Sequence, residues 1–237
     1  MEIKILYDNF RLDESMVAGW GFSALVGGSV LFDTGENGHS LLENMKAMGV
    51  STDNLSAVVI SHDHWDHTGG LWEVLRARAG LKVYGCPGFS SAFKSKVAGL
   101  KGNFVALDKM SEITAGVYAS GQIAGEYKGR GIAEQALVAR DDNRISVITG
   151  CSHPGIVEIL RKVRESFKSE DLHVVIGGFH LIGQDRRTVN VIVDEFEELG
   201  VKKAGPSHCT GDEASEIFRE RYGSDFIDVK AGMVMQT

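Results

Sequence analysis

Short apolar runs separated by glycines and polar turns make up most of the chain. Runs of β-branched and aliphatic residues predict strands over 3–7, 22–26, 30–32, 57–60, 82–84, 145–149 and 174–176. Helical periodicity beside glycines or capping residues predicts helices over 40–48, 71–79, 155–167, 189–199 and 213–222. Because the predicted strands are almost wholly apolar, we expect sheets in the interior and helices outside them.

The length and the spacing of glycines and prolines favour one domain. The chain has 237 residues, of which 43% are hydrophobic, and it can bury one substantial core. Only three prolines occur, and no Ser-rich or charge-rich linker interrupts the chain. We therefore expect a single domain over residues 1–237.

The charge and the cysteine content disfavour some classes of function and favour a cytoplasmic location. A net charge of −7 disfavours a mainly electrostatic grip on nucleic acid or on an anionic membrane. Neither a secretory signal nor an apolar stretch long enough to span a membrane is visible. Three cysteines, Cys86, Cys151 and Cys209, are too few for a disulfide framework. The prediction is a cytoplasmic protein with a small-molecule substrate and no nucleic-acid or membrane partner.

Four potential metal ligands occupy six positions directly after the predicted strand 57–60. They are His62, His64, Asp66 and His67. In a turning loop, side chains two apart project to one side, so His62 and His64 can share one ion while Asp66 and His67 face another. The alternative is a helix-capping loop, but capping gives no reason to crowd histidines together. The run predicts one or two divalent transition-metal ions, with zinc favoured and iron or manganese also compatible.

The His-x-His-x-Asp-His run, with Leu-Phe-Asp-Thr-Gly about thirty residues before it, resembles the metallo-β-lactamase superfamily. That resemblance implies an α+β fold of the αββα sandwich type, in which two mixed sheets are covered by outer helices. It also implies that Asp33 supports the metal loop through hydrogen bonds. Later segments resemble a branch labelled dihydropterin ribofuranosyl-aminobenzene phosphate synthase-like; they are Gly150-Cys151-Ser152-His153, Gly177-Gly178-Phe179-His180 and Ser207-His208-Cys209-Thr210-Gly211.

The family pattern adds a histidine, a bridging aspartate and a final histidine to the loop ligands. His153 and His208 fit the first and last of these positions. The predicted strand 145–149 ends in Gly150-Cys151, where many members have Gly-Asp. Three alternatives stay open: Cys151 supplies a thiolate, the second ion is weakly held, or His153 serves from an altered position.

Further polar residues have a functional and a structural interpretation. His180 follows a buried strand and would reach the same rim, as a substrate contact or as a donor to a developing oxyanion, or it is a structural histidine. Lys128 and Arg130 lie in a flexible-looking stretch that could clamp a phosphate or carboxylate, and Arg186 and Arg187 carry the same ambiguity. Solvated surface charges are the alternative for all four.

Together these features predict a metal-dependent hydrolase. A metal-bound hydroxide would attack a small ester-type substrate, which could be phosphorylated, with Asp66 orienting the nucleophile and His180 stabilising the developing oxygen. The alternatives are a pterin-pathway synthase-like enzyme and a non-catalytic, metal-stabilised metabolite-binding protein. Di-iron redox chemistry is disfavoured, because relatives of that type usually carry glutamate at the loop position of His64 and an added flavin domain.

Overall fold

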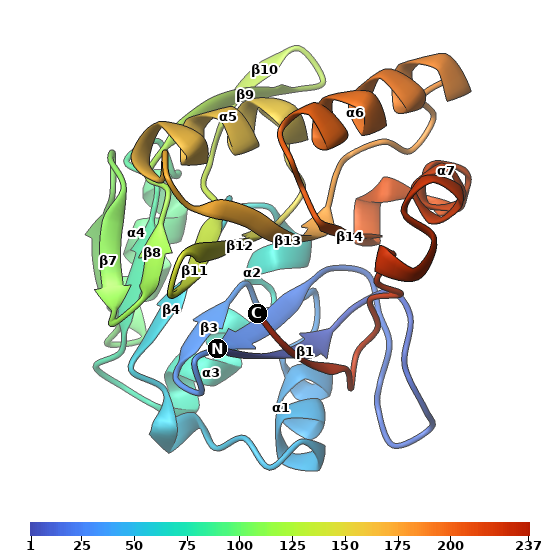
Figure 1. The fold of residues 1–237 in the computed structure, drawn as a ribbon. Coiled ribbons are helices and arrows are strands. Elements are labelled where there is room, and N and C mark those ends of the chain that lie inside the picture. The colour runs from blue at the N-terminus through green and yellow to red at the C-terminus, as the bar shows by residue number, and fades with distance from the viewer.

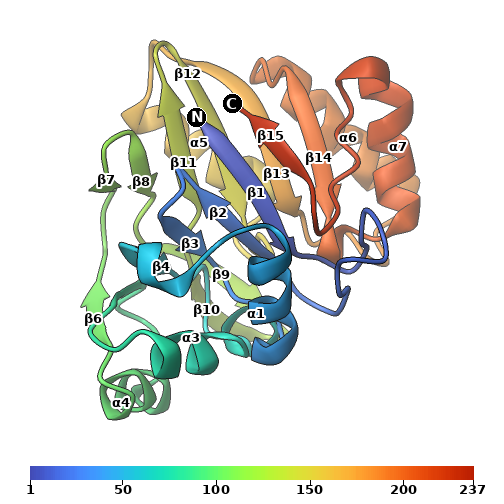
Figure 2. The ribbon, with the colours of Figure 1, turned by 90° about the horizontal axis from the view of Figure 1, so that it is seen from below.

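Two mixed β-sheets lie face to face in the computed structural model, which describes residues 1–237 (Figures 1 and 2). The first sheet has seven strands in the order β15-β1-β2-β3-β4-β5-β6. Their bounds are Val234–Gln236, Glu2–Tyr7, Ser23–Val26, Val30–Phe32, Ala57–Val59, Lys82–Gly85 and Asn103–Ala106. The strands β3 to β6 run parallel to one another.

The second sheet has six strands in the order β14-β13-β12-β11-β8-β7. Their bounds are Lys203–Ser207, Asp171–Gly178, Arg144–Thr149, Leu137–Asp141, Val117–Ala119 and Ser111–Thr114. The strands β12, β13 and β14 are parallel. A separate hairpin, formed by β9 (Ile123–Tyr127) and β10 (Arg130–Glu134), belongs to neither sheet.

Helices cover the outer face of each sheet. On the first sheet lie α1 (Gly38–Ala47), α3 (Leu71–Ala77) and α4 (Ser91–Gly99), and on the second lie α5 (Ile156–Ser166), α6 (Arg186–Glu198) and α7 (Asp212–Tyr222) (Figure 1). The sequence of α5 explains its placement, since Ile156, Ile159, Leu160 and Val163 recur at helical spacing and all four are buried. The short helix α2 (Trp65–Thr68) belongs to the loop after β4.

The core is divided into three apolar layers. One lies between the first sheet and its helices, one between the second sheet and its helices, and one between the two sheets. The middle layer joins residues of both halves, such as Ile5 and Phe32 from the first sheet and Ile148 and Val174 from the second. This arrangement confirms the predicted αββα sandwich.

The parallel strands explain where a site can form. The carboxyl ends of β3 and β4 in one sheet, and of β12, β13 and β14 in the other, lead into loops that meet at one edge of the sandwich. Loops at such strand ends are the usual location of ligand sites in parallel sheets.

Every predicted helix and strand has a counterpart, but several strands and the helices α2 and α4 were missed. The strand β14 has the sequence Lys-Ala-Gly-Pro-Ser, which contains two residues that are rare in strands. It lies at the edge of its sheet, where proline is tolerated. The stretch 126–132, expected to be flexible, is instead the tight β9–β10 hairpin, whose turn residues Lys128 and Gly129 both have positive φ.

No helix of the structure combines the length and apolar character needed to cross a membrane.

Candidate metal centre

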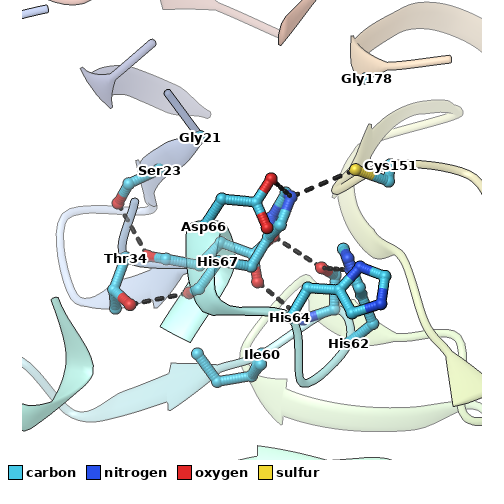
Figure 3. A network of polar contacts seen from close by, with 12 residues as sticks. Gly21, Ser23, Thr34, Ile60, His62, His64, Asp66, His67, Cys151 and Gly178 are labelled. Carbon is cyan, nitrogen blue, oxygen red and sulfur yellow. Dashed lines mark hydrogen bonds and ion pairs between the residues drawn. The ribbon is translucent and has the colours of Figure 1, made fainter. Parts of the chain in front are cut away.

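The side chains predicted to bind metal converge from three loops. His62, His64, Asp66 and His67 come from the segment after β4, His153 from the loop after β12, and His208 from the end of β14. Within the first loop, α2 begins directly after His64, so Asp66 and His67 lie on its first turn. The carbonyl oxygen of His67 accepts hydrogen bonds from the backbone N–H and the hydroxyl of Thr34, which fixes this turn (Figure 3).

The six predicted ligands fall into two groups, and a third group of Cys151, His153 and His180 overlaps both. His62, His64 and His153 form one, and Asp66, His67, Cys151 and His208 form the other; within each group all the ligand atoms lie within 4.8 Å of one another. The structure thus brings together all six residues predicted as ligands, in the division of loop residues that the sequence suggested. Cys151 joins the second group at the position of the missing aspartate, and its Sγ lies 3.2 Å from Nε2 of His67 (Figure 3).

Hydrogen bonds to the Nδ1 atoms orient these imidazole rings. Nδ1 of His67 lies 2.7 Å from a carboxylate oxygen of Asp33, and Nδ1 of His208 lies 3.1 Å from the side-chain oxygen of Asn9. The Asn9 amide also donates to the carbonyl oxygen of His208. With Nδ1 occupied, Nε2 is the atom of each ring that is free to bind an ion.

Asp33 ties the metal loop to the neighbouring strand. Besides contacting His67, its carboxylate accepts hydrogen bonds from the backbone N–H and the hydroxyl of Ser61, each at 2.7 Å. Gly150 is required beside this pair, because a Cβ there would lie 2.1 Å from Oγ of Ser61. These contacts are the supporting hydrogen bonds that the family resemblance implied for Asp33.

Glu134 has the same role on the other side of the site, and sequence reasoning missed it. Its fully buried carboxylate accepts from the backbone N–H groups of Cys151, Ser152 and His153, and lies 2.8 Å from Nδ1 of His153. Burial alone would raise the pKa of Glu134, but the bond to His153 and these N–H donors lower it. The available signal was a charged residue inside the apolar stretch 132–138, which is costly unless the charge is paired.

The donor atoms at the centre fit a transition-metal ion. Nε2 of His62 and Nε2 of His208 are buried and have no hydrogen-bond partner, which is costly for polar atoms without a ligand. Burial and the neighbouring His67 lower the pKa of His62 well below its usual value, so it is neutral, as a ligand imidazole must be. Burial would raise the pKa of Asp66, but the imidazole of His208, whose Nε2 lies 3.4 Å from Oδ2 of Asp66, and the nearby His67 hold it below its usual range, so it is a carboxylate. Neutral imidazoles beside a carboxylate are a donor set for zinc, iron or manganese.

Cys151 completes the second group with a thiol. Burial and the neighbouring Cys209 raise the pKa of Cys151 well above its usual value. A bound cation reverses that balance, because metal coordination deprotonates a thiol. All three cysteines are free and buried, as their small number predicted.

His180 and Tyr127 lie at the rim of the first group. The ring of His180 lies 4.6 Å from that of His153, and Nδ1 of His180 is buried without a partner. The backbone of His180 has a φ of 55°, an uncommon conformation for a residue other than glycine. The ring of Tyr127, at the end of β9, lies 4.9 Å from His64 and 5.1 Å from His153. The sequence marked only the neighbouring cations Lys128 and Arg130 as candidates, and Tyr127 itself was missed.

Three cavities adjoin the centre. The largest, about 650 Å³, is lined by His208 together with Trp20, whose ring lies 4.9 Å from that of His208. A second, about 490 Å³, lies between His64 and the β9–β10 hairpin, and a third, about 270 Å³, is bordered by His153 and His180. Substrate groups can therefore approach either ligand group.

The candidate cationic residues separate into two sets. Lys128 and Arg130 line the cavity beside His64. Arg186 pairs with Glu220 at 3.5 Å on the outer helices, and neither it nor Arg187 lines any of the three cavities. Of these four residues, only Lys128 and Arg130 remain candidates for binding an anionic group of a substrate.

The sequence profile of the metallo-β-lactamase superfamily matches residues 21–152, more than half of the chain and the part that holds the histidine-rich loop. The chain belongs to the metallo-β-lactamase superfamily. A solved structure described as a metal-dependent hydrolase of the β-lactamase superfamily is 31% identical, with a TM-score of 0.83 over 100% of this chain and 99% of that one. The metallo-β-lactamase fold protein YhfI from Bacillus subtilis shares the fold at 16% identity, with a TM-score of 0.71 over 100% and 98% of the two chains.

Two curated relatives of this metallo-β-lactamase-fold chain come from Methanocaldococcus jannaschii. One is the 7,8-dihydropterin-6-methyl-4-(β-D-ribofuranosyl)-aminobenzene-5′-phosphate synthase, 26% identical over 87% of this chain and 84% of that protein. Another is an uncharacterized protein, 30% identical over 88% of this chain and 90% of that protein. The branch resemblance read from the later motifs agrees with the first of them.

Proposed function

We propose that the chain is a metal-dependent hydrolase that acts on a small ester-type substrate, in the class that includes phosphorylated molecules. The observation that carries the proposal is the pair of adjoining, buried ligand groups, which contain unpartnered Nε2 atoms and open onto cavities. The name of the 31% identical relative, a metal-dependent hydrolase, supports the same class of reaction.

Two divalent ions, with zinc favoured, would be held by the two groups. His62, His64 and His153 would hold one, and Asp66, His67, Cys151 and His208 the other. When bound, such ions would supply Lewis acidity to a substrate oxygen and would make water acidic enough to act as a nucleophile near neutral pH.

The chain's own residues would orient the reacting groups and handle the proton. Asp66 is ionised at neutral pH and borders both His67 and His208, so its carboxylate can orient an attacking water and accept its proton. The side-chain hydrogen bond to Cys209 raises the pKa of His180, which favours its protonated, donating form beside His153. From that position His180 would stabilise a developing oxyanion.

The test combines metal content with turnover. The chain is loaded with zinc, iron or manganese, analysed by elemental analysis, and assayed against phenyl acetate, a lactone, a thioester and bis(4-nitrophenyl) phosphate. We expect His64→Ala and Asp66→Ala to lose metal and turnover together. The matched control is His39→Ala, since His39 lies exposed on α1. Full metal content and full turnover in either site variant would refute the assignment.

A synthase-like reaction is the second candidate, favoured by the name of the 26% identical relative. It predicts that a bond to carbon or nitrogen forms and that turnover does not need water as the nucleophile. Incorporation of ¹⁸O from labelled water into the product supports the hydrolase, and turnover without incorporation supports the synthase. Tight metabolite binding by a metal-loaded chain that turns over no substrate would instead support a binding protein.

A further inference from the structure

The β9–β10 hairpin is fixed against the candidate metal centre at its base. Gly125 on β9 packs on the backbone of the loop after β12, where an added Cβ would lie 2.7 Å from N of Pro154 and 2.8 Å from the carbonyl carbon of His153. At the end of β10, Glu134 accepts the hydrogen bonds of that same loop. The position of the hairpin is therefore set by the segment that carries His153.

The tip of the hairpin is equally well defined. Tyr127 pairs with Arg130 across a two-residue turn of Lys128 and Gly129, both with positive φ, which is the tight turn that fits the twist of a hairpin. The Tyr127 ring packs beside His64 and His153. Nζ of Lys128 lies 4.9 Å from the centre of that ring. The tip thus places two cationic side chains in the lining of a cavity that His64 also lines.

The charges around this cavity favour an anion. Neither Lys128 nor Arg130 forms an ion pair, although the chain as a whole carries a net charge of −7. The one carboxylate that lines the cavity, Asp63, already accepts a hydrogen bond from the backbone N–H of Ser90 at 2.8 Å. Glu126 neighbours Tyr127 on β9 and so projects from the opposite face of the hairpin. The cavity is therefore a local positive region on an acidic protein.

We propose that Lys128 and Arg130 form an anion subsite for a phosphate group, carried by an organic substrate whose reactive bond lies at the candidate metal centre. An arginine fork and a lysine ammonium are the side chains that bind phosphate oxygens most strongly. The cavity lies beside His64 and not between the two ligand groups, so this phosphate is a recognition group and is not itself cleaved. The subsite deepens the proposed function and rests on it for the reactive end of the substrate.

The test is binding of a phosphonate that cannot be hydrolysed. Isothermal titration at fixed ionic strength compares phenylphosphonate, inorganic phosphate and benzyl alcohol on the metal-loaded chain. We expect K128Q/R130Q to bind phenylphosphonate at least about tenfold more weakly, because two charge-assisted contacts are lost. The charge-matched control K46Q/K168Q removes two exposed lysines far from the hairpin in sequence and should change the affinity less than about twofold. The charge-conserving variant K128R/R130K should lose less affinity than K128Q/R130Q, because both positive charges remain while the position of the guanidinium fork changes.

Each other outcome overturns the subsite. Equal phosphonate affinity in K128Q/R130Q and the parent chain would mean that the anion binds elsewhere. Equal loss in K46Q/K168Q would mean that only net charge matters. Inorganic phosphate binding as tightly as phenylphosphonate would assign the cavity to free phosphate instead of an organic phosphate. Because the readout is binding, absence of turnover with every ester would contradict the proposed function and leave this result standing.

Discussion

Two buried carboxylates orient imidazole rings of this site through contacts with their Nδ1 atoms. Asp33 contacts His67 and Glu134 contacts His153, and both carboxylates are fully buried and receive several hydrogen bonds. Such partners fix the ring orientation and tautomer of a ligand histidine, and their loss typically weakens metal binding by about 10- to 100-fold. Metal binding at this centre would therefore depend on residues outside the proposed ligand set.

Glu134→Gln tests this dependence. Glutamine keeps the shape of the side chain, but its NH₂ group faces backbone N–H donors, so we expect metal affinity to fall by roughly 10- to 100-fold and the free energy of unfolding by about 2–4 kcal/mol. Competition with a chelator measures the first, and denaturant titration the second. The matched control is Glu126→Gln, exposed on the same hairpin. Unchanged metal affinity in Glu134→Gln would show that His153 needs no support.

The titration of Asp8 should make the stability of the fold depend on pH. Burial raises its pKa to about 7, and one of its two carboxylate oxygens has no hydrogen-bond partner. The unfolded chain releases this proton near pH ~4, and the folded chain keeps it until about pH 7. The contribution of Asp8 to the free energy of unfolding therefore becomes more unfavourable as the pH rises from ~4 to about 7.

Asp8→Asn removes that cost. We expect the variant to gain little at pH 4 and on the order of 2–4 kcal/mol at pH 8 relative to the parent chain. Denaturant midpoints between pH 4 and 8 measure the difference, with exposed Asp53→Asn as the control. A stability difference that does not change with pH would contradict the raised pKa.

Residues in a local motif could be read from the sequence, and residues contributed from a distance could not. The run from His62 to His67 is compact, whereas Asn9 and Tyr127 reach the site as single residues from distant segments. Asn9 is 199 residues from the histidine it supports. Such contacts depend on the tertiary fold, which periodicity does not encode.

The β9–β10 hairpin is the element on which the rim of the site depends most. Its base packs through Gly125 on the loop that carries His153, and its tip carries Tyr127. A shift at the base therefore moves the whole hairpin relative to the histidines.

Gly125→Ala should displace the hairpin. The added methyl group overlaps the backbone at His153 and Pro154, and we expect a loss of about 1–3 kcal/mol in the free energy of unfolding, with weaker phenylphosphonate binding. Gly99→Ala at the end of α4 is the control, because a Cβ there meets no atom within 4 Å and Gly99 lies outside the hairpin. Equal free energies of unfolding and equal phenylphosphonate affinities in the two variants would mean that the close approach of Gly125 to the backbone stabilises nothing. Denaturant titration and isothermal titration supply the two measurements.

Elements were predictable where the apolar pattern was strong and local. The helix α5 and the strand β12 follow from their apolar spacing alone. The hairpin did not, because Glu126 to Gly131 contains three charged residues and two glycines, a composition that also fits a mobile loop. Its strands are stabilised by their pairing and by the loop of His153, and apolar contacts with the core come from Ile123 and Ala133 at the base.

At the scale of the whole molecule, the two sheets share one apolar layer. Side chains from β1, β2 and β3 pack there against side chains from β11, β12 and β13. Neither sheet can leave the other without exposing that layer to water, so we expect one cooperative unfolding transition, in keeping with the single domain expected from the sequence. Differential scanning calorimetry tests this, and two resolved transitions for the metal-free chain would divide it into two domains.

Metal should add to this coupling, because each ligand group combines residues from both halves. The loop after β4 supplies His62 and Asp66, and the second half supplies His153 and His208. Removing the metal with a chelator should therefore lower the melting temperature by several degrees. The melting temperature should also rise with the free metal concentration, because the ion binds the folded chain. A melting temperature that does not respond to zinc from nanomolar to micromolar concentrations would contradict metal binding by this centre.

Left-handed backbone is concentrated around the same centre. Of the seven non-glycine residues with positive φ, four lie there: Asp33, Ser152, His180 and His208. Each has a backbone conformation that glycine adopts at a lower free-energy cost. Holding these four side chains in place therefore lowers the stability of the fold. Selection for heat resistance alone would then favour glycine at these positions and remove the side chains that the proposed chemistry needs, so stabilising substitutions that preserve the site have to lie elsewhere in the molecule.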